Sequence, residues 1–350
     1  MRILKKSAWK AFNKAFGLGP DALINTIKDK GLTGKSGASF PTGLKLELTR
    51  KAAGKEKYFI CNAHEGEPGT FKDRFIIENN ASNVIEGIAI ASFAIGAKKA
   101  FIYFKHGYPE TVRLLENTIK GSKKHLDKIG LEIIVLSGAG AYVCGEATAV
   151  IDSIEGCRGE PRHVPPFPTD KGLFGKPTCI DNLETVANIP ILLIDNSWKN
   201  DIRLFSVSGN VQNPGVYEFQ LGTPLDEVLK AAKPKGRVKA VYFGASGGCI
   251  LPKCQLCQQD ICKRGAGLGC CSIIVVDKSK SIVEVAKNFA EFFVHESCGK
   301  CTPCREGTFR ILELLEKFSD GDATYLDLEM LEDLADYVQD TSFCGLGQTA

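Results

Sequence analysis

A run of cysteines near the C-terminal end constrains this chain more than any other feature. Cys298, Cys301 and Cys304 follow the pattern C-x-x-C-x-x-C, and Cys344 lies 40 residues beyond the last of them. Three thiolates in one run can hold three corners of an iron–sulfur cubane, and a remote fourth thiolate closes it. Zinc sites with four cysteines usually pair two separate C-x-x-C turns, so the spacing favours a [4Fe–4S] cluster over zinc. The chain must therefore fold so that these four thiols meet in space.

Cysteine is concentrated in the last third of the chain. The sequence has 350 residues and 14 cysteines, ten of which lie between positions 249 and 344. The N-terminal segment is basic, but no continuous apolar stretch follows it, so we expect neither a signal peptide nor a disulfide framework. The crowded cysteines therefore indicate metal or cluster ligation. The other four, Cys61, Cys144, Cys157 and Cys179, are interpreted as small core residues.

A second group of cysteines precedes the C-terminal run. Cys249, Cys254, Cys257 and Cys262 are spaced C-x4-C-x2-C-x4-C, and a cysteine pair follows at positions 270 and 271. The C-x4-C-x2-C part is typical of the first ligands in plant-type [2Fe–2S] proteins. Zinc would suit the same thiols, and reduced thiols without any ligand are the third interpretation. Residues 249–271 thus form a candidate second site, for an additional Fe–S cluster or Zn, whose content the spacing leaves open.

Net charge and hydropathy exclude several classes of partner. The 44 basic and 41 acidic residues leave a charge of +3, which is no footprint for nucleic acid or for an anionic membrane. The longest apolar stretch, residues 87–97, is too short to cross a bilayer. We therefore expect a cytoplasmic protein without direct membrane insertion, which lies peripheral to a membrane only through partner subunits.

Hydrophobic periodicity divides the first 200 residues into alternating helices and strands. Helices are predicted at residues 1–30, 83–95 and 109–119, and strands at 57–61, 100–104 and 131–136. The helix at 83–95 is predicted to begin at a capping box formed by Asn83 and Glu86. Strands that alternate with helices indicate an α/β sheet domain, which we place at residues 1–199.

The pattern changes after residue 200. Two strands at 204–207 and 216–219 flank a turn, and a helix at 225–231 and a strand at 240–243 follow. This predicts a small α+β module at residues 200–280, which contains the cysteine-rich loop. Helical patterns at 285–295, 308–318 and 326–340 then predict a helical domain at residues 281–350 that carries the last four cysteines.

A glycine-rich loop suggests a phosphate site in the first domain. Glycines in the loop at residues 34–43 let backbone N–H groups approach phosphate oxygens, and Lys35 and Lys45 add positive charge. The loop matches neither the Walker fingerprint nor the dinucleotide fingerprint. A plain glycine turn is therefore the alternative.

Three carboxylates lie in loops of the same domain. Glu65 and Glu67 share one loop, and Glu146 follows a glycine. Beside a bound nucleotide, such groups can accept ribose hydroxyls or orient water and ring nitrogens. A solvated surface loop is the ordinary alternative for such carboxylates.

Seven segments together resemble the NADH-binding flavoprotein (51-kDa type) subunit of respiratory complex I. The same family supplies the diaphorase subunits of NAD-linked hydrogenases and formate dehydrogenases. The segments, which follow the family's order over almost the whole chain, are residues 34–45, 61–74, 138–146, 155–162, 165–168, 175–185 and 296–307. The resemblance implies an α/β Rossmann-like flavin domain, a ubiquitin-like (SLBB-type) module and a C-terminal four-helix-bundle iron–sulfur domain.

The resemblance also implies cofactors and the residues that bind them. The residues that match the family's FMN site are Gly34, Lys35, Ser36, Lys45, Asn62, Glu65, Gly145, Ile180, Asp181, Asn182 and Thr185. The nicotinamide of NAD(H) or NADP(H) is implied to stack on the flavin near Glu67, Tyr142 and Glu146, with its adenine against Phe40 and Phe167. Glu67 and Glu146 are the residues implied to act in catalysis.

The implied function is that of an oxidoreductase subunit. Hydride is exchanged between NAD(P)H and FMN, and single electrons pass to the [4Fe–4S] cluster. The implied partners are a small [2Fe–2S] subunit and a larger iron–sulfur subunit of a redox complex. Two alternatives are an electron-relay subunit that keeps FMN and cluster but has lost nicotinamide binding, and a scaffold that keeps only the cluster.

Several positions depart from the family pattern. His64 stands where the family usually has aspartate beside the flavin, and Ala147 replaces a glutamate that holds the adenine ribose. Leu48 and Val164 replace an aromatic residue and a lysine of the cofactor pocket. Loss of the ribose carboxylate removes both an attraction for NADH and a repulsion of the 2′-phosphate of NADPH. We therefore expect a relaxed or altered nicotinamide preference.

Overall fold

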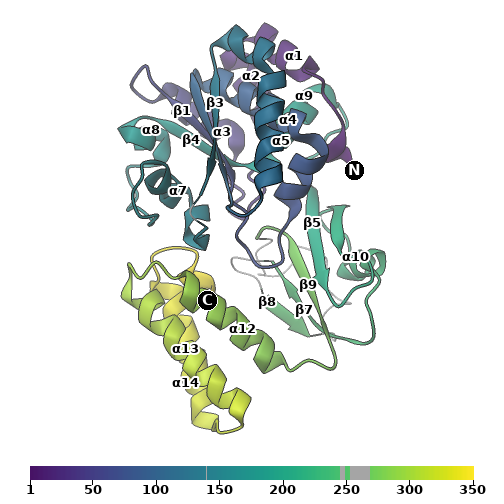
Figure 1. The fold of residues 1–350 in the computed structure, drawn as a ribbon, viewed down its shortest axis with the longest axis vertical. Helices are drawn as coiled ribbons and strands as arrows, with labels where there is room; N and C mark the ends of the chain where they lie inside the picture. The colour runs from purple at the N-terminus through teal and green to yellow at the C-terminus, as the bar shows by residue number, and fades with distance from the viewer. Residues whose placement is uncertain (139, 245–248, 253–268) are drawn as a thin grey trace.

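The first part of the chain is built on a parallel sheet of four strands (Figure 1). The computed structural model describes all residues except 139, 245–248 and 253–268. In the order β3-β2-β1-β4, the strands are β3 (Glu132–Ser137), β2 (Lys99–Phe104), β1 (Tyr58–Ala63) and β4 (Thr178–Asn182). All three pairings are parallel, so the four carboxyl ends lie at one edge of the sheet. Ligands of open α/β sheets bind at this edge.

Helices cover both faces of this sheet. The helices on one face are α1 (Lys10–Leu18), α2 (Pro20–Asp29), α4 (Lys72–Ile95) and α9 (Leu183–Ile194). The opposite face packs against α7 (Ala147–Ile154). In β1, Phe59, Cys61 and Ala63 join the first core, whereas Tyr58 and Ile60 join the second, as the alternation of side chains along a strand requires. Burial on both faces is typical of parallel sheets.

Most of the predicted elements of this part are confirmed. The strands predicted at 57–61, 100–104 and 131–136 are β1, β2 and β3, and the helix predicted at 109–119 is α5 (Pro109–Gly121). The sequence analysis missed β4, a short strand with polar residues at its end, and the apolar helix α9 behind it. The remaining elements are α3 (Thr42–Lys51), α6 (Lys123–Leu126), α8 (Pro168–Lys171) and the 3₁₀ turns η1 (Arg2–Leu4), η2 (Asp127–Ile129), η3 (Tyr142–Gly145) and η4 (Leu173–Gly175).

The prediction of a single helix over residues 1–30 is wrong. The chain forms the turn η1 and then two helices, α1 and α2, that meet at Gly19. Gly19 has a φ of 76° and Pro20 is the first residue of α2. A left-handed glycine followed by proline ends one helix and begins the next.

The capping box predicted at Asn83 and Glu86 is also wrong. α4 already begins at Lys72, and its backbone is kinked at Asn80, with φ −155° and ψ 46°. The carboxylate of Glu86 instead accepts N–H groups of Trp9 (3.0 Å) and Phe12 (2.9 Å), at the start of α1. Glu86 therefore caps a helix that is remote in sequence, which local spacing could not reveal.

A second, smaller sheet follows. In the order β6-β5-β9-β7-β8, its strands are β6 (Gly215–Gln220), β5 (Ile202–Gly209), β9 (Ser272–Asp277), β7 (Val238–Phe243) and β8 (Cys249–Pro252). The predicted hairpin is confirmed, because β5 and β6 pair antiparallel, and α10 (Leu225–Ala232) packs on the sheet. The analysis missed β9, which pairs parallel with β5 and antiparallel with β7.

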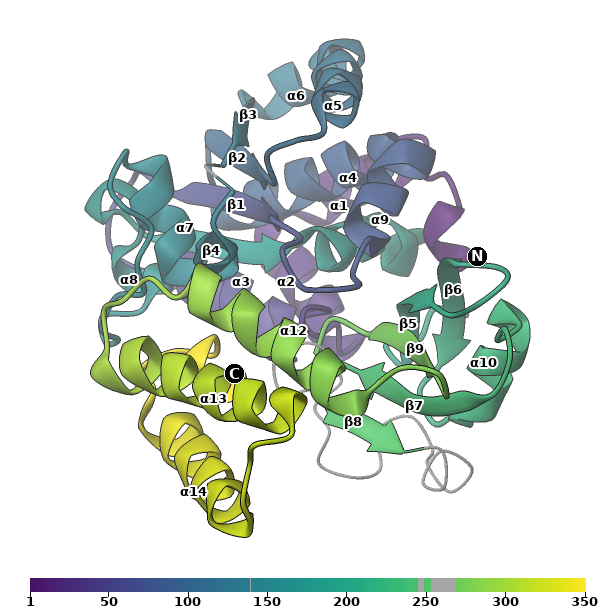
Figure 2. The same ribbon diagram turned by 60° about the horizontal axis from the view of Figure 1, so that its bottom comes forward.

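The C-terminal part is helical, as predicted (Figure 2). It contains α12 (Ile282–Glu296), α13 (Thr302–Asp320) and α14 (Tyr325–Thr341), followed by the 3₁₀ turn η5 (Gly347–Thr349). The expected four-helix bundle is thus three α-helices and one 3₁₀ turn. Buried Ala290, Ile311, Leu315 and Val338 hold the three helices together. No helix in the described part of the chain is long and apolar enough to span a membrane.

The close approach of α4 to α9 depends on Gly87. A Cβ at this position would lie 2.2 Å from the carbonyl oxygen of Val186 on α9, so Gly87→Ala must push two core helices apart. We expect Gly87→Ala to lower the free energy of unfolding by about 1–3 kcal/mol or more, as measured by chemical denaturation. Gly121→Ala is the matched control, because nothing lies within 4 Å of a Cβ on this helical glycine. An equal effect of both substitutions would contradict the prediction.

Candidate functional site

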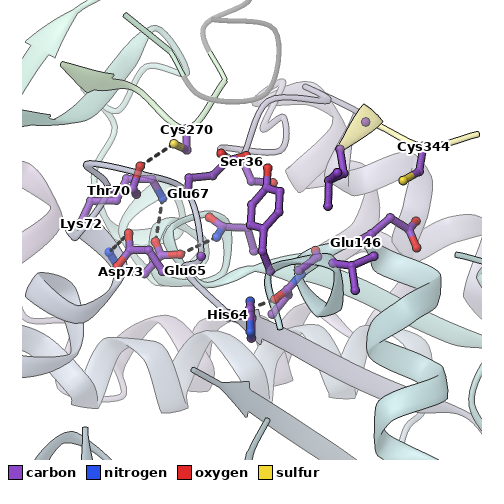
Figure 3. Close-up of a pocket in the computed structure, with 18 residues that line it drawn as sticks. Ser36, His64, Glu65, Glu67, Thr70, Lys72, Asp73, Glu146, Cys270 and Cys344 are labelled. Atoms are coloured by element: carbon purple, nitrogen blue, oxygen red, sulfur yellow. Dashed lines mark hydrogen bonds and ion pairs between the residues drawn. The ribbon is translucent and has the colours of Figure 1, made fainter. Parts of the chain in front are cut away.

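A cavity of about 830 Å³ lies at the carboxyl edge of the parallel sheet and is partly open to solvent (Figure 3). The loops after β1 and β3, the end of β4 and the start of α4 form most of its wall. The lining residues are Ser36, Asn62, His64, Glu65, Gly66, Glu67, Thr70, Lys72, Asp73, Tyr142, Val143, Gly145, Glu146, Asn182, Cys270, Cys344, Gly345 and Leu346.

Three helices begin at this cavity, and a cavity residue caps each of them. Glu65 accepts the second and third N–H groups of α4, at 2.9 and 3.2 Å. Glu146 accepts two N–H groups of the first turn of α7, at 2.8 and 2.9 Å, and Asn182 accepts one from α9 at 3.0 Å. Residues predicted to touch cofactors therefore also fix the helix starts around the cavity.

A buried group of charges lies behind the cavity wall. The ammonium of Lys72 is 2.7 Å from Asp73 and 3.0 Å from Glu184, and all three side chains are almost completely buried. Asn182 donates to the other oxygen of Asp73 at 2.6 Å. Burial alone would lower the pKa of Lys72, but the two carboxylates raise it well above its usual value. Burial raises the pKa of Asp73, against the opposing effect of Lys72.

Two glycines give the cavity its width. A Cβ on Gly66 would lie 2.9 Å from the ring of Tyr142, and a Cβ on Gly145 would lie 3.4 Å from the ring of His64. The hydroxyl of Tyr142 donates to Glu67 at 2.5 Å, so this predicted pair lies together in the wall. Glycine at position 66 therefore lets the loop after β1 lie close against the ring of Tyr142.

His64 carries no charge in this wall. Its side chain is buried and lies against the ring of Tyr103, with ring centroids 5.7 Å apart. Burial, and then the nearby Lys105, lowers the pKa of His64 to about 4. Neither ring nitrogen has a hydrogen-bond partner among the described residues. Where the resemblance expects an aspartate, this chain therefore has a neutral imidazole.

The structure holds the ammonium groups of Lys35 and Lys45 away from the cavity. Lys35 donates to the carbonyl oxygens of Asn200 (2.8 Å) and Ile202 (3.1 Å), and burial followed by Arg203 lowers its pKa to about 7. Lys45 pairs with Asp181 at 2.7 Å. Burial by itself would lower the pKa of Lys45, but the effect of the neighbouring Asp181 carboxylate is larger, so the pKa of Lys45 is raised. Neither lysine lines the cavity, so their predicted role at a phosphate has no direct support from it.

The other predicted residues lie around the cavity without all lining it. Thr185 accepts the backbone N–H of Lys35 at 2.9 Å, and Gly34 donates its N–H to the carbonyl of Phe40, also at 2.9 Å. Ile180 and Asp181 lie in β4, next to Asn182. The two aromatic residues predicted for the adenine, Phe40 and Phe167, are 42% and 53% exposed, so both are accessible for stacking with a ligand.

The four C-terminal cysteines surround a second, smaller cavity. Cys298, Cys301, Cys304 and Cys344 all line a space of about 280 Å³. Cys301 is the N-cap of α13 and Cys304 lies in its first turn, where the helix dipole favours anionic thiolates. Within the described residues, no three Cys, His, Asp or Glu side chains converge closely enough for a single metal ion. Four thiols arranged around one cavity are suited to an iron–sulfur cluster, because each iron of such a cluster binds one thiolate.

Three residues line both cavities: Val143, Cys344 and Leu346. Val143 follows β3, whereas Cys344 and Leu346 follow α14. The backbone N–H of Tyr142 donates to Glu296 of α12 at 2.7 Å, which ties the two parts together beside this shared wall. A flavin in the larger cavity and a cluster in the smaller one would therefore be separated by single side chains.

The sequence analysis missed several residues of the site. Lys72, Asp73, Thr70 and Val143 line the larger cavity, and Ser297 contacts the Sγ of Cys304 at 3.3 Å. Lys72, Asp73 and Thr70 lie inside segment 61–74, which is one of the segments that resemble the family. Their residue types and spacing by themselves did not indicate a site. Charged residues at a helix start usually face solvent, and only the tertiary structure shows that these are buried.

The remaining cysteines give a mixed outcome. Cys61, Cys144 and Cys179 are buried as predicted, but Cys157 is exposed, so its interpretation as a core residue is wrong. Cys270 lines the larger cavity, 2.6 Å from the hydroxyl of Thr70. The predicted second site at Cys249, Cys254, Cys257 and Cys262 lies outside the described residues, apart from the backbone of Cys249 in β8.

Three family models match consecutive parts of the chain. Residues 27–191 match the Nuo51 FMN-binding domain, residues 204–232 match the SLBB domain, and residues 284–350 match the NADH-ubiquinone oxidoreductase-F iron–sulfur binding region. The first match contains most of the larger cavity, and the last contains all four cysteines of the smaller one.

Relatives match over nearly the whole chain. The NADH-quinone oxidoreductase F subunit of Aquifex aeolicus (strain VF5) is 43% identical, covering 99% of this chain and 86% of that protein. The HndC subunit of the NADP-reducing hydrogenase of Solidesulfovibrio fructosivorans is 37% identical, covering 97% and 74%. A chain of a solved NAD+-reducing [NiFe]-hydrogenase in the H2-reduced state has a TM-score of 0.89 and 37% identity, over 95% of this chain. This chain spans 60% of that hydrogenase chain.

Proposed function

Because this chain belongs to the family of NADH-quinone oxidoreductase F subunits, we propose that it is the flavin and iron–sulfur subunit of a multi-subunit oxidoreductase. In this role, hydride is exchanged between NAD(P)H and FMN in the larger cavity, and single electrons pass to a [4Fe–4S] cluster in the smaller one. The fold is a mixed α/β fold with a parallel sheet, like that of the hydrogenase chain.

The shared wall of the two cavities carries this proposal. Val143, Cys344 and Leu346 line both spaces, so electrons need to cross only one layer of side chains. When bound, FMN supplies the exchange between a two-electron donor and a one-electron acceptor. The chain's own residues hold the two groups next to each other and keep bulk water out of the wall between them.

The residues of the larger cavity would orient the flavin. Asn62 and Asn182 offer amide groups from the ends of two adjacent strands, and Gly66 and Gly145 leave room for the ring. Glu67, held by Tyr142, and Glu146 are the groups we assign to the nicotinamide side, with Phe40 and Phe167 as stacking surfaces for adenine. Cys298, Cys301, Cys304 and Cys344 would each ligate one iron of the cluster.

We assign these tasks to consecutive parts of the chain. Residues 1–199 hold FMN and nicotinamide, residues 200–280 form the SLBB-type module, and residues 281–350 hold the cluster. Two separate sheets and a C-terminal helical part support this division. Single-electron output requires an acceptor, so we assign as partners a small [2Fe–2S] subunit and a larger iron–sulfur subunit.

Nicotinamide preference is the property in which this chain is expected to depart most from its family. Ala147 is exposed and is the first residue of α7, where the family has a ribose-binding glutamate. Without this carboxylate, the start of α7 no longer repels the 2′-phosphate of NADPH. One relative, HndC, belongs to an NADP-reducing hydrogenase. The second candidate function, a relay that has lost nicotinamide binding, is favoured by the same substitution and by Leu48 and Val164.

Anaerobic titration of the purified protein tests the function and the preference together. We expect NADH and NADPH both to bleach the flavin absorbance of the wild-type protein. Ala147→Glu should then weaken the response to NADPH relative to NADH by roughly three- to tenfold, because a carboxylate beside a phosphate is repulsive. Ala141→Glu, at an exposed position before η3, is the control for added charge. Flavin that neither nucleotide bleaches would support the relay instead.

A further inference from the structure

The carboxylates behind the larger cavity differ in their ion pairing. The buried group of charges contains the ammonium of Lys72. This ammonium contacts two carboxylates, Asp73 at 2.7 Å and Glu184 at 3.0 Å. Glu65 is the third carboxylate. It forms no ion pair within the described part of the chain and is held by two backbone N–H groups at the start of α4. Lys35 is a further cation near Glu184. Glu65 is therefore the carboxylate of the group without an ion pair in the described residues, and burying its charge is costly unless a proton is bound.

Glu65 is the member of this group in the best position to exchange that proton. Glu65 and Asp73 both line the cavity, but Glu65 is half-buried, whereas Asp73 and Glu184 are only 2% exposed and are paired with Lys72. The neighbours of Glu65 come from every element packed against it. Lys72 and Asp73 of α4 and Cys270 before β9 interact with Glu65 directly, whereas Glu184 of α9 acts on Asp73 and Glu67 acts on Cys270.

The ionisation of Glu65 agrees with this position. Burial, followed by the nearby Asp73, raises the pKa of Glu65 to about 7, while Lys72 and the two N–H donors act in the opposite direction. A carboxyl group in such surroundings changes its charge near neutral pH, so additional negative charge in the cavity makes it bind a proton.

We propose that Glu65 is the proton-exchanging group of the cavity, which takes up a proton from solvent as negative charge enters the cavity and releases it as that charge leaves. The proposal rests on the function proposed above, because electrons arriving on the cofactor are the source of the charge. One O–H bond forms on the carboxylate and breaks again, and no electrons are gained or lost by Glu65. The exchange keeps the total charge of the cavity and the buried group together nearly constant through the reaction.

Proton uptake by the flavin-loaded protein tests the proposal. The flavin is reduced electrochemically at pH 8 in a weakly buffered solution, so that nicotinamide binding does not matter, and the protons taken up per flavin are counted. We expect Glu65→Gln to take up about 0.5–1 proton fewer than the wild-type protein. Glu132→Gln is the control for loss of a carboxylate, because Glu132 is exposed at the start of β3 and lies outside both cavities.

An infrared difference spectrum of the same samples provides the second readout. Reduction should produce a protonated-carboxyl band in the wild-type protein, in Glu132→Gln and in Glu65→Asp, which keeps the acid, but not in Glu65→Gln. Equal proton uptake and an unchanged band in flavin-loaded Glu65→Gln would overturn the proposal alone. A wild-type protein that binds no FMN would overturn the proposed function instead, so the two failures are distinguishable.

Discussion

Replacing Cys344 with serine is expected to remove the iron–sulfur cluster while the flavin remains bound. Cys344 is one of the four thiols around the smaller cavity and is the only one of them that also lines the larger one. A serine hydroxyl ionises far less readily than a thiol and is a harder ligand, so it is a poor substitute on iron. Electron transfer to a protein acceptor should fall on the order of a hundredfold or more, since even outer partners of metal ligands are worth 10–100-fold.

Anaerobically purified protein provides the measurement for this variant. Iron and acid-labile sulfide should be lost together, and bleaching of the flavin by nicotinamide should be retained. Cys157→Ser is the control, because Cys157 is exposed and lies outside both cavities. A Cys344→Ser protein with the iron and sulfide content of the wild type would show that these thiols do not hold the cluster.

Lys72→Met is expected to have the largest effect on stability. It removes the ammonium from between Asp73 and Glu184 and leaves two buried carboxylates without a cation. Breaking a buried ion pair from one side costs about 3–5 kcal/mol, because the remaining charge stays desolvated. Chemical denaturation at pH 8 should show this loss. Lys10→Met, at an exposed position of α1, should change the free energy of unfolding by no more than about 0.5 kcal/mol.

The effect of Lys72→Met should also depend on pH. Without Lys72, the pKa of Asp73 in the folded state, which burial already raises, rises further above its value in the unfolded chain. Carboxyl groups with raised pKa values destabilise the folded state increasingly as pH rises through the range between the two values. The destabilisation should therefore be smaller at pH 5 than at pH 8. A loss of stability that is equal at both pH values would indicate lost packing instead of unpaired charge.

Local patterns predicted those elements whose signals lie close together in the chain. The spacing of Cys298, Cys301 and Cys304 predicts a cluster site because three ligands in one run are a local property. Alternating apolar runs identified β1 to β3 and α5 for the same reason, since the periods of strands and helices extend over few residues. Where the signal was not local the predictions failed, as with the capping role of Glu86, which acts on α1 over more than 70 residues.

The sequence by itself determined the family, predicted the four cysteines of the cluster site, and indicated the alternation of β1, β2 and β3 with helices. Only the tertiary structure decided that Lys72, Asp73 and Glu184 form one buried group, that His64 is neutral, and that Cys344 lies in a wall common to two cavities. These properties depend on burial and on contacts between segments that lie from about 40 to about 200 residues apart. Charge, hydrogen bonding and electron transfer all depend on distance in space, which spacing along the chain does not specify.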